Sequence, residues 1–182
     1  MSWRILALVA VLALGGQALA EGLYLSEPQL AERLFPEGKG LAASTVSLTD
    51  AEADRVALLF GYRLEQKSFR LLAAGEAGTI FVLDVMGQNA PITFGVGVTR
   101  DGVVRGVELV AYRESRGEEI RAPRFLRQLT GKRLTDPLKL GKDVDAITGA
   151  TISSRSATLA TRKALALAQV LRERVPPAAP AR

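Results

Sequence analysis

The chain has 182 residues, 48% of them hydrophobic, and a formal net charge of +5, so it is long enough for one domain with a hydrophobic core. It contains no cysteine and no histidine, which excludes disulfides, thiolate zinc sites, iron–sulfur clusters, c-type haem attachment and histidine-based catalysis. The basic residues are scattered, so nucleic acid is not an expected partner, although weak attraction to an anionic membrane surface or an acidic protein is compatible with the charge.

Residues 1–20 have the pattern of an export signal. Arg4 gives a short positive start, Ile5–Leu14 is an uninterrupted apolar run, and Ala18-Leu19-Ala20 offers small residues at the cleavage positions. The alternative is a retained membrane anchor, but a run of ten apolar residues is shorter than the roughly 20 that span a bilayer. We therefore expect cleavage after Ala20 and a periplasmic protein. The expected domain is 21–175, and after Pro176-Pro177 the segment 176–182 is expected to be a disordered tail.

Two capping boxes predict helices in the first third of the mature chain. Ser26 and Gln29 begin the first, with Pro28 tolerated in its first turn, and Thr49 and Glu52 begin the second. The predicted elements are a helix over 27–34, a short strand over 46–48 and a helix from 49 to about 60, ended by Gly61.

The pattern then changes to strands, predicted over 69–74, 79–86, 92–99 and 103–112. Asp101-Gly102 is a strong hairpin signal between the last two strands. Gly95 and Gly97 alternate with apolar residues and leave room for a backbone, a helix or a ring. The expected fold class is α+β: a single domain with a twisted, mainly antiparallel sheet and helices packed on one side.

A polar loop, Arg113–Glu119, follows the last strand and by itself is typical of a solvated charge run. Pro123 can begin a helix that carries Phe125, Leu126 and Leu129 and ends at Gly131. A long helix is predicted from about Ser153 to Arg174. Its apolar stripe, expected to pack on the sheet, consists of Ala157, Ala160, Ala164, Leu167, Ala168 and Leu171.

The stretch DAITGATISS, residues 145–154, leads directly into that helix. Gly149 and Ala150 leave little side-chain bulk around the hydroxyl of Thr151, and the positive end of the following helix suits a phosphate. The ordinary interpretation is a helix start, with Ser153 or Ser154 as N-cap and Gly149 in the turn.

The complete string closely resembles the attachment motif of the covalent FMN-binding domain family, which occurs in the flavin-carrying subunits of Rnf-type complexes and of the sodium-pumping NADH:quinone oxidoreductase. The motif residues present are Asp145, Thr148, Gly149, Ala150 and Thr151. The resemblance implies that Thr151 carries FMN through a phosphoester. It also implies that Asp145 belongs to the recognition pattern of a separate flavin transferase that uses FAD.

The resemblance covers about residues 46–171 and extends to the polar loop. Tyr-Arg-Glu-Ser-Arg-Gly-Glu-Glu-Ile looks like the small stand-alone and regulator-linked branch of the family and departs from the Pro-Gly-Leu-Gly form of the complex subunits. In the family this loop lies against the flavin ring. The cofactor-binding residues that the resemblance implies in addition to the motif are Glu114, Ser115, Arg116, Gly117, Ser153 and Ser154.

The implied function is an exported electron carrier that passes electrons between membrane-associated or periplasmic redox partners. The chain offers no evident machinery for substrate turnover and no metal site with calcium-loop spacing, so no catalytic or metal-binding residue is assigned. Two alternatives stay open: a flavin-free sensory or assembly module of the same fold, and a flavin reductase acting on a small exported substrate.

Export gives a first testable prediction. Protein recovered from the extracytoplasmic fraction should begin at Glu21, because Ala18-Leu19-Ala20 offers the cleavage site. Intact-mass analysis measures the N-terminus directly. A protein that keeps Met1 and stays membrane-bound would contradict the expectation of a soluble carrier.

Overall fold

The computed structural model describes residues 22–38 and 42–174. The predicted signal segment and the segment 176–182 lie outside the described residues. The elements are α1 (Glu27–Leu34), β1 (Ala42–Ser47), α2 (Asp50–Phe60), β2 (Ser68–Ala73), β3 (Gly78–Met86), β4 (Pro91–Thr99), β5 (Val104–Ala111), η1 (Glu118–Arg121), α3 (Pro123–Leu126), η2 (Arg127–Leu129) and α4 (Thr151–Arg174).

The five strands form one antiparallel sheet in the order β1-β2-β3-β4-β5, so each strand pairs with its neighbour in the chain. This confirms the predicted α+β fold class. The strand predicted over 46–48 was wrong in extent, since β1 runs from Ala42 to Ser47. Its first residues, Ala-Ala-Ser-Thr, carry little strand signal of their own, and pairing with β2 makes them extended.

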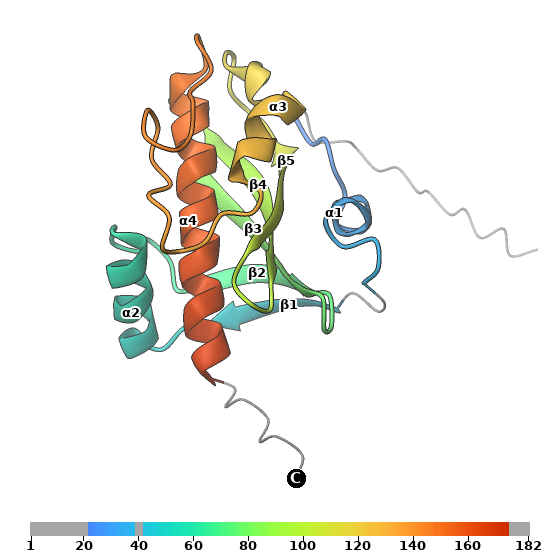
Figure 1. Ribbon diagram of the computed structural model, residues 1–182, viewed down its shortest axis with the longest axis vertical. Helices are drawn as coiled ribbons and strands as arrows, with labels where there is room; N and C mark the ends of the chain where they lie inside the picture. The colour runs from blue at the N-terminus through green and yellow to red at the C-terminus, as the bar shows by residue number, and fades with distance from the viewer. Residues whose placement is uncertain (1–21, 39–41, 175–182) are drawn as a thin grey trace, which may run out of the picture.

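Helices cover both faces of the sheet, which corrects the expectation that they pack on one side (Figure 1). Successive residues along β4 point to opposite faces of the sheet. Phe94 and Val96 lie in the core shared with α2 and α4, whereas Gly95 faces α1 on the opposite side. A Cβ at Gly95 would lie 2.5 Å from Leu30 Cδ1, so this glycine makes room for a helix rather than for a ring.

The long helix α4 packs across the middle of the sheet on the face opposite α1 (Figure 1). The predicted stripe is confirmed, because Ala157, Ala160 and Ala164 are completely buried and Leu167 lies with them in the main core. Their small side chains allow the helix axis to lie close to β3 and β4. With 24 residues the helix is about 36 Å long, so its two ends lie far apart on the molecule.

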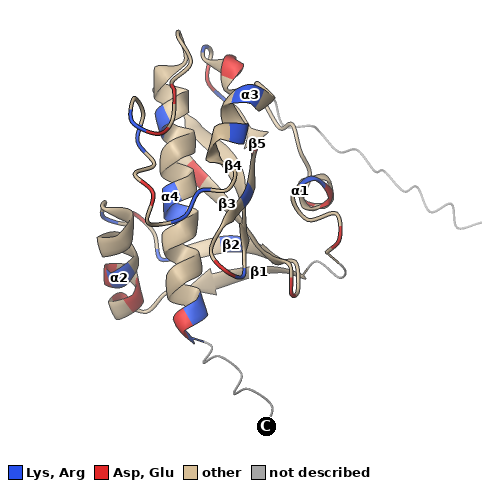
Figure 2. Cartoon of the chain, viewed as in Figure 1, with Lys and Arg blue, Asp and Glu red and all other residues tan. Residues whose placement is uncertain are grey.

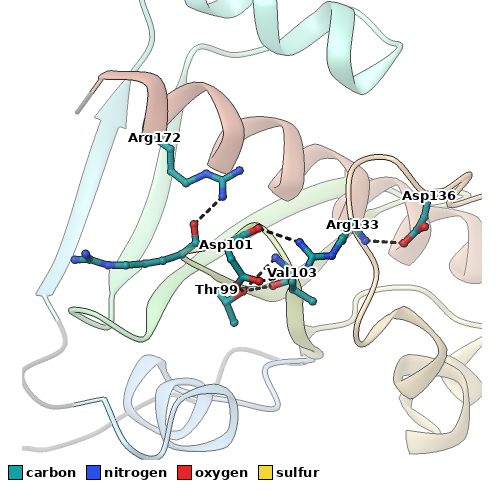
Figure 3. Close-up of polar contacts among 7 residues, drawn as sticks. Thr99, Asp101, Val103, Arg133, Asp136 and Arg172 are labelled. Atoms are coloured by element: carbon teal, nitrogen blue, oxygen red, sulfur yellow. Dashed lines mark hydrogen bonds and ion pairs between the residues drawn. The ribbon is translucent and has the colours of Figure 1, made fainter. Parts of the chain in front are cut away.

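The C-terminal part of α4 is held against the β4–β5 hairpin (Figure 3). Arg172 Nη1 donates to the carbonyl of Arg100 over 2.7 Å. Within the turn, Thr99 Oγ1 donates to Asp101 Oδ1 over 2.6 Å, and this bond is the main reason why the pKa of Asp101 is lowered. Gly102 has φ of +77°, so the predicted Asp-Gly hairpin is confirmed.

Charged residues are distributed over the helices, strands and loops in the view of Figure 2, with both signs interspersed. Within 22–38 and 42–174, no helix is long and apolar enough to cross a membrane.

Glu52 of the predicted capping box at the start of α2 also links α2 to the end of α4. Glu52 accepts from the Thr49 backbone N–H over 2.8 Å, and its carboxylate binds the guanidinium of Arg174 at the end of α4. The hydrogen bonds from Arg174, then those from Thr49, lower the pKa of Glu52 from 4.5 to about 2.

These contacts predict a pH-dependent contribution of Glu52 to stability. A carboxyl whose pKa falls on folding stabilises the native state above its unfolded pKa, and this contribution disappears as pH falls through the folded pKa. Glu52→Gln should therefore lower the midpoint of thermal unfolding at pH 7. The difference from wild type should shrink as pH falls from 4.5 towards 2, the interval between the two pKa values.

Circular dichroism melts between pH 7 and pH 2 measure this effect. Glu76→Gln is the control, because the Glu76 side chain is 87% exposed in its ion pair with Arg100 and such pairs contribute little. A Glu52→Gln variant that melts like wild type at pH 7 would contradict the assigned role.

Candidate functional site

The stretch 145–154 forms a turn and the beginning of α4. Gly149 has φ of +86°, in the left-handed region that glycine favours, so the predicted turn is confirmed. Thr148, Gly149 and Thr151 are exposed, whereas Ala150 is buried. Thr151 is the first residue of the helix, where backbone N–H groups lack partners within the helix.

The predicted N-cap role of Ser153 or Ser154 was wrong, because α4 begins two residues before Ser153. Both serines are buried in its first turn. Ser154 Oγ donates to the carbonyl of Ala150 over 2.9 Å and accepts from the Ile147 backbone N–H over 3.2 Å. Ser154 therefore holds the turn that carries Thr148 and Gly149 from its inner side, and its hydroxyl is not presented to a ligand.

The polar loop after β5 packs directly on the helix start, so the structure brings the two sequence motifs together. Gly117 has φ of +90°, and a Cβ there would lie 2.7 Å from Ser153 Oγ. Tyr112 joins the two segments, since its hydroxyl donates to the Arg116 carbonyl over 2.5 Å and lies 2.9 Å from Ser153 Oγ. Burial raises the pKa of Tyr112, so the phenol keeps the proton for this bond.

Sequence analysis did not single out Tyr112 as a site residue. Its position directly before the polar loop, at the end of an apolar strand, is the available signal, because a buried tyrosine hydroxyl needs a partner. Ser115 and Arg116, by contrast, are exposed on the loop, as expected for groups that can meet a ligand.

Glu114 has a structural partner in the turn between β3 and β4. Its Oε1 accepts from the backbone N–H groups of Asn89 over 2.7 Å and of Ala90 over 3.0 Å. The bonds from Ala90 and then Asn89 are the main reason why the pKa of Glu114 is lowered. Glu114 therefore stays ionised and anchors this turn beside the polar loop.

The end of β3 also meets the first turns of α4. Ser156 Oγ bonds to the carbonyl of Met86 over 2.9 Å and to that of Ile152 over 3.1 Å. The side chains of Met86 and Ile152 are unusually exposed for apolar residues, at 60% and 43%. Two exposed apolar residues, Met86 and Ile152, thus belong to the segments that meet at the start of α4, which sequence patterns did not indicate.

A basic residue also lies one helical turn after Thr151. Arg155 is exposed and, at the i+4 position, shares a helix face with Thr151. The signal that could have identified it is its helical spacing from Thr151, since Arg155 itself lies outside the linear motif.

Asp143 and the motif residue Asp145 differ in their surroundings. The Asp143 carboxylate accepts from the Lys139 and Leu138 backbone N–H groups and from Lys132 Nζ over 2.9 to 3.1 Å. Burial raises the pKa of Asp143, but these bonds outweigh it and the net pKa is lowered. Asp145 is exposed, and its backbone rather than its carboxylate is held, by Gln128.

The residues present fit a phosphate-linked planar cofactor. Thr151 is exposed at the start of a 24-residue helix, where the helix dipole favours an anion, and the next residue, Ile152, is an exposed apolar one. Among the described residues there is no group of acidic side chains that could hold a metal ion.

The Tyr112 hydroxyl gives a prediction for the loop. Tyr112→Phe keeps the ring in the core but removes the bonds to Arg116 and Ser153, so it should destabilise the domain by about 1 kcal/mol. Hydrogen exchange in residues 113–117 should become faster. Urea unfolding and exchange mass spectrometry measure both effects, and Tyr62→Phe is the control because Tyr62 is 57% exposed. Unchanged exchange in the loop would contradict the role of Tyr112.

A search of curated proteins found no match. The crystal structure of Shewanella oneidensis NqrC is similar, with a TM-score of 0.53 and 17% identity over 75% of this chain and 84% of that chain. At this identity the similarity concerns the fold alone.

A family model described as "FMN-binding domain" matches residues 87–166. The matched segment begins at the turn that Glu114 anchors and contains the polar loop, the attachment motif and the first turns of α4. The resemblance to the FMN-binding domain family that was stated from the sequence is thereby confirmed over residues 87–166.

Proposed function

We propose that Thr151 carries FMN as a phosphoester and that the exported protein relays electrons between membrane-associated or periplasmic redox partners. The observation that supports this most directly is the position of Thr151. It is exposed, it is the first residue of α4, and it lies beside the Tyr112–Gly117 loop within the FMN-binding domain.

Attachment requires a separate flavin transferase that uses FAD. A bond forms between Thr151 Oγ1 and the phosphorus of the FMN half, the phosphoanhydride bond of FAD breaks, and AMP leaves. The hydroxyl proton must pass to a base, because a threonine hydroxyl is a weak nucleophile. The chain has no histidine or cysteine, and the attachment stretch offers only Asp143 and Asp145 as local bases. Asp143 is engaged by Lys132 and two backbone N–H groups, and Asp145 is assigned to transferase recognition, so we assign the base to the transferase.

The attached phosphate would lie at the start of α4. A negative charge there is stabilised by about 0.3–1 kcal/mol through the helix dipole. Arg155, exposed one turn further along, would add a cation on the same face. Neither interaction needs a rearrangement of the helix.

Isoalloxazine accepts one or two electrons, and the protein holds the ring and adjusts its potential. Met86 and Ile152 offer an apolar surface for the ring, and Ser115, Arg116 and the Gly117 backbone offer polar groups from the adjoining loop. Glu114 acts through the 87–90 turn, so Ser115 is the more direct candidate for a polar contact.

The attachment site gives the central prediction. After co-expression with a flavin transferase, peptide mass mapping should find one FMN on Thr151. Thr151→Ala should fold normally and carry no covalent flavin, whereas Thr151→Ser, which keeps a hydroxyl, is the control that should still be modified. Thr148→Ala and Asp145→Ala should lower the extent of modification without unfolding the domain.

The outcomes also separate the other functions. A colourless wild-type protein, or flavin on another residue, would contradict the proposal and favour a flavin-free module. Protein that stays yellow after denaturation but turns over a small acceptor in steady state would favour a flavin reductase over a carrier.

A further inference from the structure

Gln128 makes a two-point contact with the backbone of Asp145, the first residue of the attachment motif. The Asp145 N–H donates to Gln128 Oε1 over 2.9 Å, and Gln128 Nε2 donates to the Asp145 carbonyl over 3.3 Å. One side-chain amide thus pairs with both polar groups of a single residue. Nothing in the sequence pattern indicated this contact, since 17 residues separate the two positions.

The position of Gln128 is itself fixed by the core. It lies in η2 (Arg127–Leu129), next to Leu129, which is completely buried, and one turn after the buried Phe125. The amide therefore holds Asp145 against a rigid part of the domain. It binds only the backbone of Asp145, which leaves the exposed carboxylate available to another molecule.

The same segment is held at a second point on its way to Thr151. Ser154 Oγ accepts from the Ile147 N–H over 3.2 Å, so the backbone is fixed two residues after Asp145. A cavity of about 510 Å³ extends along this segment and is lined by Phe125, Gln128, Asp145 and Ile147 among others. Asp145 and Ala146 are exposed, so a partner can reach this part of the segment.

We propose that Gln128 is a positioning residue for flavin transfer: it fixes the backbone of Asp145 so that the Asp145 carboxylate and the Thr151 hydroxyl are presented to the transferase together. This inference rests on the proposed function, because it concerns modification of Thr151. The transferase then recognises a folded arrangement that includes a residue outside the linear motif. Because the segment is already fixed in the free protein, less conformational entropy is lost when the transferase binds.

A double-mutant cycle tests the inference. Initial rates of FMN transfer to the purified full chain are measured by intact mass with purified transferase, saturating FAD and varied concentrations of acceptor protein. Gln128→Ala should lower kcat/KM by about tenfold, mainly by raising KM. A tenfold change corresponds to the net free energy of about one hydrogen bond. The final stoichiometry should stay at one FMN per chain. In an Asp145→Ala background, Gln128→Ala should have little further effect, because it acts through Asp145.

Two further variants separate positioning from a general loss of structure. Gln128→Glu keeps the acceptor for the Asp145 N–H but loses the donor, so its rate should lie between those of wild type and Gln128→Ala. Arg127→Ala changes an exposed neighbour in η2 that lines a different hollow, with Arg105 and Gly106, and should transfer FMN at the wild-type rate. Hydrogen exchange at 145–147 should be fastest in Gln128→Ala, intermediate in Gln128→Glu and unchanged in Arg127→Ala.

Each result decides the question. Wild-type rates in Gln128→Ala, or effects of Gln128→Ala and Asp145→Ala that are independent and multiply, overturn the positioning role while Thr151 modification still stands. Absence of FMN on wild-type Thr151 overturns the proposed function and this inference with it. If Gln128→Ala fails to fold, Gln128→Glu replaces it in the test. Its rate of FMN transfer is then measured alone and in the Asp145→Ala background.

Discussion

The close packing of α4 on the sheet is the constraint on which the rest of the structure depends. Alanines at 157, 160 and 164 are completely buried, so the helix lies close to the strands over its whole middle part. The buried hydroxyls of Thr158 and Thr161 donate to carbonyls one turn earlier and therefore need no partner outside the helix. At the far end, Glu52 and the β4–β5 hairpin hold Arg174 and Arg172. With the helix fixed along its length, the position of its first residue, Thr151, is fixed as well.

Around that first residue, polar groups divide into those that bond within the protein and those that face outwards. Tyr112, Ser153 and Ser154 are buried and join the loop, the turn and the helix to one another. Glu114 and Asp143 are bound by backbone N–H groups, so their carboxylates organise loops. The outward-facing set consists of Asp145, Thr148, Thr151, Ser115, Arg116 and Arg155. The inner set gives the outer set a defined arrangement, and the outer set is the one that the proposed function assigns to the cofactor and the transferase.

Local signals predicted much of this fold. Capping boxes at Ser26 and Thr49, the Asp-Gly hairpin and the left-handed Gly149 were all correct, because each depends on residues near one another in sequence. The sequence did not predict that helices cover both faces of the sheet. The glycines in β4 indicate free space, but they do not show whether a helix or a ring fills it; at Gly95 the side chain of Leu30 fills it. The N-cap prediction for Ser153 and Ser154 failed because tertiary contacts from Tyr112 and Ile147 engage their hydroxyls inside the first turn. Gln128 and Tyr112 were missed for the same reason: each acts on a segment distant in sequence.

The exposed apolar residues beside Thr151 gain a physical explanation from the proposed function. An isolated exposed methionine or isoleucine needs none, but Met86 and Ile152 come from β3 and α4 and are joined by the bonds of one hydroxyl, Ser156 Oγ. Before attachment, this open surface leaves Thr151 accessible to a transferase. After attachment, a planar ring tethered to Thr151 could cover the same surface and remove its apolar area from water. Under the proposed function, the exposure of these residues would serve the modification, and their burial under the ring would favour one bound position.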